Sequence, residues 1–231
     1  MEIRNGRVRG LDLHLARLDA ATRELFGEGL DGGLVCERVR GALRTAGVTD
    51  AGVRVYVHLP PGDGTVRPVT TVIARPPTPE PEAPQRLTAV TYQRPAAHLK
   101  HTGVFGQSYH LRRAQAAGFD EALLTGPDGI VAEGAITNVG FVEGDTVVWP
   151  DAPALDGITM LLLRRELDRL GLPWVRRPVC LADIPSFDGA FVSNSLGVAP
   201  VGRIDELSVP VDVPVVGRLR SLYANAEWDV I

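Results

Sequence analysis

One lysine stands out by the chemistry that it could perform. Lys100 is the only lysine in the 231-residue sequence, because 23 of the 24 lysine and arginine residues are arginine. Arginine keeps its proton and cannot form a Schiff base, whereas the primary amine of lysine can lose a proton and attack a carbonyl. Lys100 is therefore a candidate for covalent amine chemistry. The alternative is a chance survivor of a strong compositional bias.

A carboxylate follows at a position that suits the same chemistry. Glu133 is expected just past a turn and before a strand, among the small residues Ala132, Gly134 and Ala135. A carboxylate against the ring nitrogen of pyridoxal phosphate keeps that nitrogen protonated, so that the ring can accept electrons. The alternative is a solvated loop glutamate.

Two further segments have the composition of phosphate-binding sites. Residues 156–159 (Asp-Gly-Ile-Thr) open a predicted helix, where free amide groups and the helix dipole attract anions, and Thr159 adds a hydroxyl. Residues 191–197 lead from a strand into a polar turn that contains Asn194 and Ser195. Taken alone, each segment is also typical of an ordinary helix start or turn.

The elements that must position these residues follow from the hydrophobic periodicity. Five prolines between residues 75 and 84 exclude a helix or a central strand, so we predict a linker over 77–84. It separates predicted domains of residues 1–76 and 85–231. The first domain is predicted to contain a hairpin over 2–10, helices from 11 to Gly27 and over 33–46, strands over 52–59 and 69–74, and a turn at 60–64.

The second predicted domain mixes strands and helices without strict alternation, which indicates an α+β fold class. Lys100 lies in a connecting segment before the first of its helices. The predicted helices cover 103–117, 158–170 and 214–225, and the predicted strands cover 86–92, 121–124, 130–131, 137–142, 146–149, 174–177, 189–193 and 200–204.

Composition narrows the class of protein. The net charge is −4 and no basic stripe is present, so no nucleic-acid partner is expected. No run of 18 apolar residues occurs and the start of the chain is polar, so neither a membrane span nor a signal peptide is expected. Cys36 and Cys180 lie far apart, which argues against a disulfide framework or a metal site. We expect a cytoplasmic protein that acts on a small molecule.

The order of these features resembles the class IV fold type of pyridoxal-phosphate enzymes, which includes branched-chain aminotransferases, D-amino acid aminotransferases and aminodeoxychorismate lyases. The resemblance covers residues 10–205. It rests on five short motifs in order: His14 to Leu18, Leu99 to His101, Glu133-Gly134 with Thr137-Asn138, Gly157 to Thr159, and Phe191 to Ser195 followed by Ala199 to Val201.

The resemblance implies a fold of two α/β domains with the cofactor in the cleft between them, and a homodimer. Lys100 would form the Schiff base with pyridoxal 5′-phosphate and move the proton, while Glu133 would hold the ring nitrogen. The cofactor would also be bound by Arg17, which pairs with the phosphate, and by Asn138, Ile158, Thr159, Asn194 and Ser195.

Two arginines are candidates for binding the substrate. Arg54 resembles a family position and is our candidate for the substrate carboxylate, with Arg94 as a second candidate and a surface arginine as the alternative for both. Phe105 stands where branched-chain members have a tyrosine that reaches the cofactor. His98 is a possible modulator of Lys100, although a packing role is the simpler interpretation.

The resulting hypothesis is an aminotransferase that acts on a small amino acid or amine and a keto acid. A lyase of the 4-amino-4-deoxychorismate type is the alternative, because Leu99-Lys100-His101 and Asn194-Ser195-Leu196 resemble that branch more closely. A second alternative is a cofactor-binding protein with little turnover, because family members usually carry a further pocket-forming segment before the position of Met1.

Overall fold

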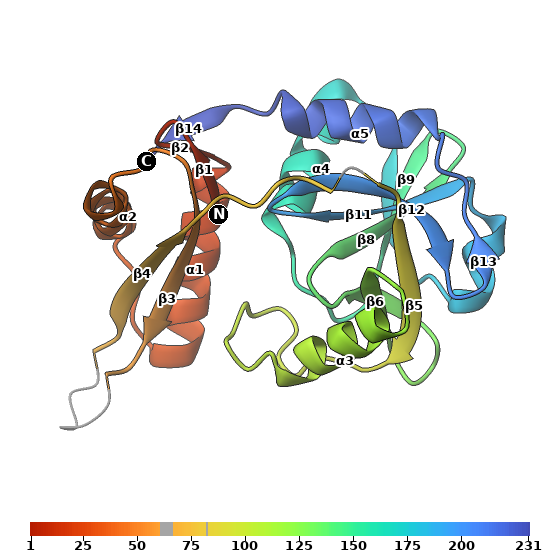
Figure 1. The fold of residues 1–231 in the computed structure, drawn as a ribbon, viewed down its shortest axis with the longest axis horizontal. Coiled ribbons are helices and arrows are strands. Elements are labelled where there is room, and N and C mark those ends of the chain that lie inside the picture. The colour runs from red at the N-terminus through yellow and green to blue at the C-terminus, as the bar shows by residue number, and fades with distance from the viewer. Residues whose placement is uncertain (61–66, 82) are drawn as a thin grey trace. The chain divides into compact units, whose positions relative to one another are not determined.

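The computed structural model of the chain describes residues 1–60, 67–81 and 83–231, which form two compact units (Figure 1). Residues 1–79 and 226–231 make up the first unit, and residues 80–225 make up the second. The sequence assigns residues 226–231 to the second domain, but β14 (Trp228–Val230) pairs with a strand of the first unit. The predicted turn at 60–64 lies outside the described residues from residue 61 onwards.

The first unit is an antiparallel sheet with two helices. Its strand order is β14–β2–β1–β3–β4. The predicted hairpin forms at the N-terminus, where Asn5 and Gly6 take the positive φ angles, 50° and 68°, that a type I′ turn requires. The elements are β1 (Glu2–Arg4), β2 (Arg7–Arg9), α1 (Leu11–Phe26), α2 (Gly32–Ala46), β3 (Ala51–His58) and β4 (Val69–Arg75).

Helical and strand periodicities together build the core of the first unit. Val35, Val39 and Leu43 recur every four residues and form the buried face of α2. They pack with Ala51 and Val53, which are alternate residues of β3 and therefore face the same side of the sheet. Ile231, the last residue of the chain, is buried in the same cluster.

The second unit is a nine-stranded mixed sheet that curls on itself. Its order is β10–β9–β8–β11–β12–β5–β6–β7, with β13 paired to β12. The curl brings β7 to the segment that follows β10, where the Val131 amide donates to the Val179 carbonyl at 2.8 Å. The strands are β5 (Gln85–Thr91), β6 (Glu121–Thr125), β7 (Val131–Gly134), β8 (Asn138–Glu143), β9 (Thr146–Pro150), β10 (Trp174–Arg177), β11 (Gly189–Asn194), β12 (Gly197–Ile204) and β13 (Leu207–Ser208).

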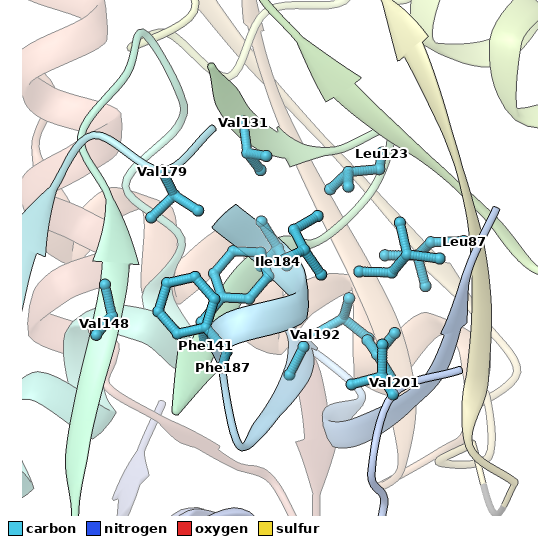
Figure 2. Packing of buried hydrophobic residues seen from close by; sticks show 14 of the residues in the cluster. Leu87, Leu123, Val131, Phe141, Val148, Val179, Ile184, Phe187, Val192 and Val201 are labelled. Atoms are coloured by element: carbon cyan, nitrogen blue, oxygen red, sulfur yellow. The ribbon is translucent and has the colours of Figure 1, made fainter. Parts of the chain in front are cut away.

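Side chains from most of these strands fill the inside of the curled sheet (Figure 2). The rings of Phe141 and Phe187 stack with centroids 4.8 Å apart in this core. Phe187 follows the short helix η1 (Leu181–Ser186), whose Ile184 is buried in the same cluster. The sheet is thus held in its curled form by one apolar cluster, and its outer surface remains available for helices.

Three helices cover the outer surface of this sheet. Figure 1 shows α3 (Phe105–Ala116) on one side of the second unit, and α4 (Ile158–Leu170) with α5 (Pro214–Ala224) on the other. All three helices lie where the sequence predicts them, within a few residues at each end. None of the helices in the described parts of the chain is long and apolar enough to cross a membrane.

Candidate functional site

Lys100 lies on an irregular segment between β5 and α3, and Arg94 fixes the shape of that segment. The guanidinium of Arg94 is buried and donates to the Ala97 and Leu99 carbonyls at 3.0 Å each. The Leu99 carbonyl belongs to the peptide group that leads into Lys100. Arg94 therefore holds the backbone next to Lys100, while the Lys100 residue itself is exposed.

His101 fixes the other side of Lys100. The Gly103 amide donates to His101 Nδ1 at 3.1 Å, so Nε2 carries the proton of the neutral ring and donates to the Pro95 carbonyl at 2.9 Å. This ring joins the two ends of the segment. His98, the possible modulator of Lys100, is exposed. His101 and Arg94 together organise the backbone around Lys100.

Glu133 lies inside strand β7, opposite Leu124 of β6, whereas the sequence predicts a position between a turn and the next strand. Its side chain is 6% exposed. One carboxylate oxygen, Oε1, accepts from Arg94 Nη1 at 2.8 Å, and the other, Oε2, accepts from the Leu155 amide at 3.1 Å. Arg94 thus connects this carboxylate to the segment that carries Lys100.

The electrostatics of Glu133 depend on burial and on two cations. Removal from water raises the pKa of Glu133, while the hydrogen bond and charge of Arg94 oppose that rise. The positive charge of Lys100 also lowers the pKa of Glu133, to a smaller extent. The amine and the carboxylate therefore share one electrostatic environment within the second unit.

Arg94 is not the substrate ligand that the sequence offers as its second candidate. Its side chain is 4% exposed, and both terminal nitrogens are occupied by Glu133 and by backbone carbonyls. That prediction was wrong because a sequence shows the number of arginines but not which of them is buried. A buried carboxylate requires a cationic partner, and Arg94 meets that requirement for Glu133.

The predicted phosphate-binding residues meet where α4 begins. The N-cap residue of α4 is Gly157, which has no side chain to satisfy the first amides of the helix. The Thr159 hydroxyl donates to the Asn194 carbonyl, which joins the helix start to the end of β11. The Asn194 side chain accepts from the Leu196 amide at 2.9 Å and shapes the turn that contains Ser195.

Tyr223 of α5 is a residue at this end of the unit that the sequence interpretation omits. Its hydroxyl donates to the Ser195 carbonyl at 3.3 Å. Because Tyr223 lies 28 residues further along the chain, no local pattern connects the two positions. Only the packing of α5 against β11 and β12 brings them together.

Asn138, predicted to bind the cofactor, contacts the loop before α4. Its Nδ2 donates to the Leu155 carbonyl at 2.7 Å, and its side chain is buried. Asn138 opens strand β8 directly after the turn that follows Glu133. The structure therefore brings Glu133, Asn138, Thr159 and Asn194 into one connected set of contacts.

Arg17 and Arg54 belong to the first unit. Arg17 lies on α1, and burial lowers its pKa to about 10, which leaves the guanidinium charged at neutral pH. Arg54 lies on β3 with an exposed side chain, 3.5 Å from the Tyr56 hydroxyl. Both residues are cations on regular elements, and their predicted roles stay predictions.

Two features of the second unit have the chemistry to bind a ring that carries a protonated nitrogen and a phosphate. Glu133 is a buried acceptor for an N–H group, and the uncapped start of α4 offers donors to an anion. The sequence model described as "Amino-transferase class IV" matches residues 1–204. The chain belongs to the class IV aminotransferase family. The predicted family is confirmed, and so is the α+β fold class.

Individual relatives agree with this family. A probable branched-chain-amino-acid aminotransferase from Synechocystis sp. is 32% identical over 112 residues, which are 47% of this chain and 37% of the relative. One from Rickettsia felis is 35% identical over 119 residues, 49% of this chain and 41% of the relative. This class IV chain thus spans about two fifths of the length of the curated relatives that it matches.

One solved structure, from Legionella pneumophila, has the provisional name 4-amino-4-deoxychorismate lyase. It aligns with a TM-score of 0.88 at 20% identity, over 98% of this chain and 90% of that one. A similarity at this level of identity shows the class IV fold and leaves the reaction open. No group of three or more His, Cys, Asp or Glu side chains that could hold a metal ion occurs among residues 1–60, 67–81 and 83–231.

Proposed function

We propose that this protein is a pyridoxal 5′-phosphate-dependent aminotransferase. It moves an amino group from a small amino acid or amine to a keto acid, so that the donor becomes a carbonyl compound and the acceptor becomes an amine. The observation that carries the proposal is the Arg94 bridge, which ties the buried Glu133 carboxylate to the backbone of the only lysine.

Each residue has a role within this proposal. The bound cofactor supplies an aldehyde and a ring that accepts electrons. Lys100 Nζ attaches the cofactor and moves a proton, and Glu133 holds the ring nitrogen in its protonated form. Asn194, Ser195, Ile158 and Thr159 lie at the phosphate end, with Arg17 as its cationic partner and Arg54 as the ligand of the substrate carboxylate.

The cofactor part of the proposal is tested by absorbance and borohydride reduction. We expect the purified protein, supplied with pyridoxal phosphate, to be yellow and to retain the cofactor covalently after reduction, with the label on Lys100. Lys100→Ala and Lys100→Arg should both lose the label, and the arginine variant controls for charge because it keeps the cation without a primary amine. A colourless protein that stays colourless with added cofactor would refute the proposal.

A lyase of the 4-amino-4-deoxychorismate type is the second candidate. The motifs around Lys100 and Asn194 favour it, and the Legionella pneumophila neighbour supports the same fold. Adding an amino donor with and without a keto acid separates the two reactions. An aminotransferase needs the acceptor for more than one turnover, whereas a lyase turns over without it. Binding with no turnover in either assay would favour the third interpretation, a cofactor-binding protein.

We also propose a homodimer in the cytoplasm, without nucleic-acid or membrane partners. The family resemblance supports the dimer, and the two free cysteines, Cys36 and Cys180, suit a reducing compartment. Light scattering of the cofactor-loaded protein tests the dimer. A mass equal to one chain at micromolar concentration would contradict it.

A further inference from the structure

We infer that Asn138 is a positioning residue that sets the separation between the two ends of the cofactor site. It would act through the backbone of Leu155, by fixing where α4 begins relative to Glu133. The inference rests on the proposed function, since it concerns the ring-nitrogen contact of Glu133 and the phosphate contacts at the start of α4. It replaces the direct cofactor contact that the sequence predicts for Asn138.

Leu155 is held by both of its backbone polar groups. Its amide donates to Glu133 Oε2 at 3.1 Å, and its carbonyl accepts from Asn138 Nδ2 at 2.7 Å. All three residues are buried. Measured over the whole residue, the exposed fraction is 4% for Glu133, 8% for Asn138 and 9% for Leu155. A buried residue whose amide and carbonyl are both bonded has one favoured position, because moving it would leave a polar group without a partner.

Gly157 shows that the contact with Asn138 is close on the other side as well. A Cβ atom at residue 157 would lie 2.0 Å from Asn138 Oδ1, far inside van der Waals contact. The backbone of Gly157 has φ −70° and ψ 143°, which any residue adopts. The glycine is therefore required by the space that Asn138 occupies, and not by its backbone conformation.

The same glycine begins α4. The Gly157 carbonyl accepts the first helical bond, from the Leu161 amide at 2.9 Å, and Ile158 and Thr159 follow at once. Asn138 thus touches the loop at two points, the Leu155 carbonyl and residue 157, which lie on either side of Asp156. Between them these contacts determine where the first amides of α4 stand with respect to Glu133.

A rigid ligand makes this separation matter. The ring nitrogen and the phosphate of one cofactor lie at a fixed distance, so both contacts form fully only if Glu133 and the helix start have the matching separation. A loose loop would still hold the ring end but would lose much of the phosphate contact. Loss of this positioning should therefore reduce the affinity that the phosphate adds, while the affinity for the ring stays nearly the same.

The experiment compares pyridoxal 5′-phosphate with pyridoxal, its analogue without phosphate. Apoprotein is titrated with each ligand and the absorbance is recorded. The result is a ratio, the dissociation constant of pyridoxal divided by that of pyridoxal 5′-phosphate. We expect Asn138→Ala to reduce this ratio by about tenfold, with pyridoxal affinity nearly unchanged. Thr125→Val is the matched control, because Thr125 is buried in β6 and its hydroxyl bonds the Val90 carbonyl of β5 and not the loop before α4, so the ratio should be kept.

A second variant tests whether Asn138 acts through its contact with the start of α4. Gly157→Ala keeps the Asn138 amide but displaces it, so it should lower the ratio as Asn138→Ala does, and it carries the test if Asn138→Ala does not fold. In the double variant the shorter side chain at position 138 leaves room for the new Cβ at position 157. Positioning therefore predicts that the two losses do not add.

The outcomes are distinct. An unchanged ratio in both single variants, or losses that add in the double variant, would overturn the role of Asn138. An equal loss of affinity for both ligands would show general loosening of the unit and would overturn it too. If the unmodified protein binds neither ligand, the proposed function itself fails.

Discussion

At the scale of single residues, Arg94 connects the two groups on which the proposed chemistry depends. Its side chain bonds Glu133, Ala97 and Leu99, so the carboxylate and the lysine segment are held by one guanidinium. Its planar fork makes these three bonds in fixed directions, which a lysine could not do. Glu133 in turn depends on Arg94 for its charge balance.

Removing Arg94 should therefore destabilise the protein. In Arg94→Met, Glu133 stays buried without its cation, and we expect the free energy of unfolding to fall by about 3 kcal/mol. Urea unfolding followed by tryptophan fluorescence measures the change. The matched control is Arg86→Met, because the Arg86 side chain is 53% exposed in its pair with Asp120 and its loss should lower the free energy of unfolding much less. Equal costs for the two variants would contradict the role given to Arg94.

Glu121 is a second buried carboxylate and should make stability depend on pH. It is 3% exposed, one of its oxygens accepts from the Thr137 hydroxyl at 3.2 Å, and burial raises the pKa of Glu121 to about 7. Because this pKa lies above the unfolded value of 4.5, the stabilising contribution is complete below pH 4.5. It is lost as the pH rises through 7.

Glu121→Gln should remove this part of the pH dependence. Between pH 4.5 and 8 the unmodified protein should lose on the order of 3 kcal/mol more stability than the variant does. Urea unfolding across that range measures both slopes. Glu206→Gln, at a side chain that is 92% exposed, should keep the slope of the unmodified protein. A Glu121→Gln variant with that same slope would show that Glu121 does not titrate in this range.

At the scale of elements, α3 follows the Lys100 segment, and a glycine near its start packs closely against Tyr92. A Cβ atom at Gly106 would lie 2.2 Å from the Tyr92 hydroxyl, so the Tyr92 ring occupies the place where a side chain would stand. The same ring lies against His110 with centroids 5.0 Å apart. The start of α3 is therefore positioned by a tyrosine that follows β5 and precedes Arg94.

Gly106→Ala should thus cost stability although alanine favours helices. We expect a loss of about 1–3 kcal/mol, because Tyr92 must leave its place. Gly217→Ala is the control, since Gly217 is exposed on α5 with nothing within 4 Å of a new Cβ, and it should stabilise by up to about 1 kcal/mol. Thermal unfolding shows whether each variant is more or less stable than the unmodified protein. A stabilised Gly106→Ala variant would refute the packing argument.

At the scale of the whole molecule, the last six residues belong to the unit that the first residues build. β14 pairs with β2 at Trp228–Arg9 and Val230–Arg7, and Ile231 is buried with Ile3 and Val8. The chain thus leaves the first unit near residue 79, forms the whole second unit, and returns. The stability of the first unit depends on both ends of the sequence.

Truncation after Asn225 should therefore weaken only the first unit. We expect faster hydrogen exchange in β1, β2 and β3, and unchanged exchange in β8 and β11, because the truncation removes an edge strand and a core side chain from the first sheet alone. Val230→Thr is the control. Val230 is 66% exposed, so this change should leave hydrogen exchange in β1, β2 and β3 unaltered. Faster exchange in β8 would contradict the division into units.

The local elements, and the types of residue that can do the chemistry, follow from the linear order of residues alone. Helical periodicity, the Asn5-Gly6 turn and the glycines after helices are local signals, because their causes lie within a few residues. The single lysine and the order of short motifs identified the family, since both are properties of the linear chain. The predicted α1, α2, α4 and α5 agree closely with the structure for the same reason.

The pairing of the polar side chains depends on the three-dimensional fold. Arg94 bonds a carboxylate 39 residues away, Tyr223 bonds a carbonyl 28 residues away, and β14 pairs across almost the full length of the chain. A buried polar group takes whichever partner the fold brings to it, because leaving it unpaired in the core costs more than any local preference. For this reason the contacts of Arg94 and Asn138 depend on the curled sheet, which brings Glu133 and Leu155 together from distant parts of the chain.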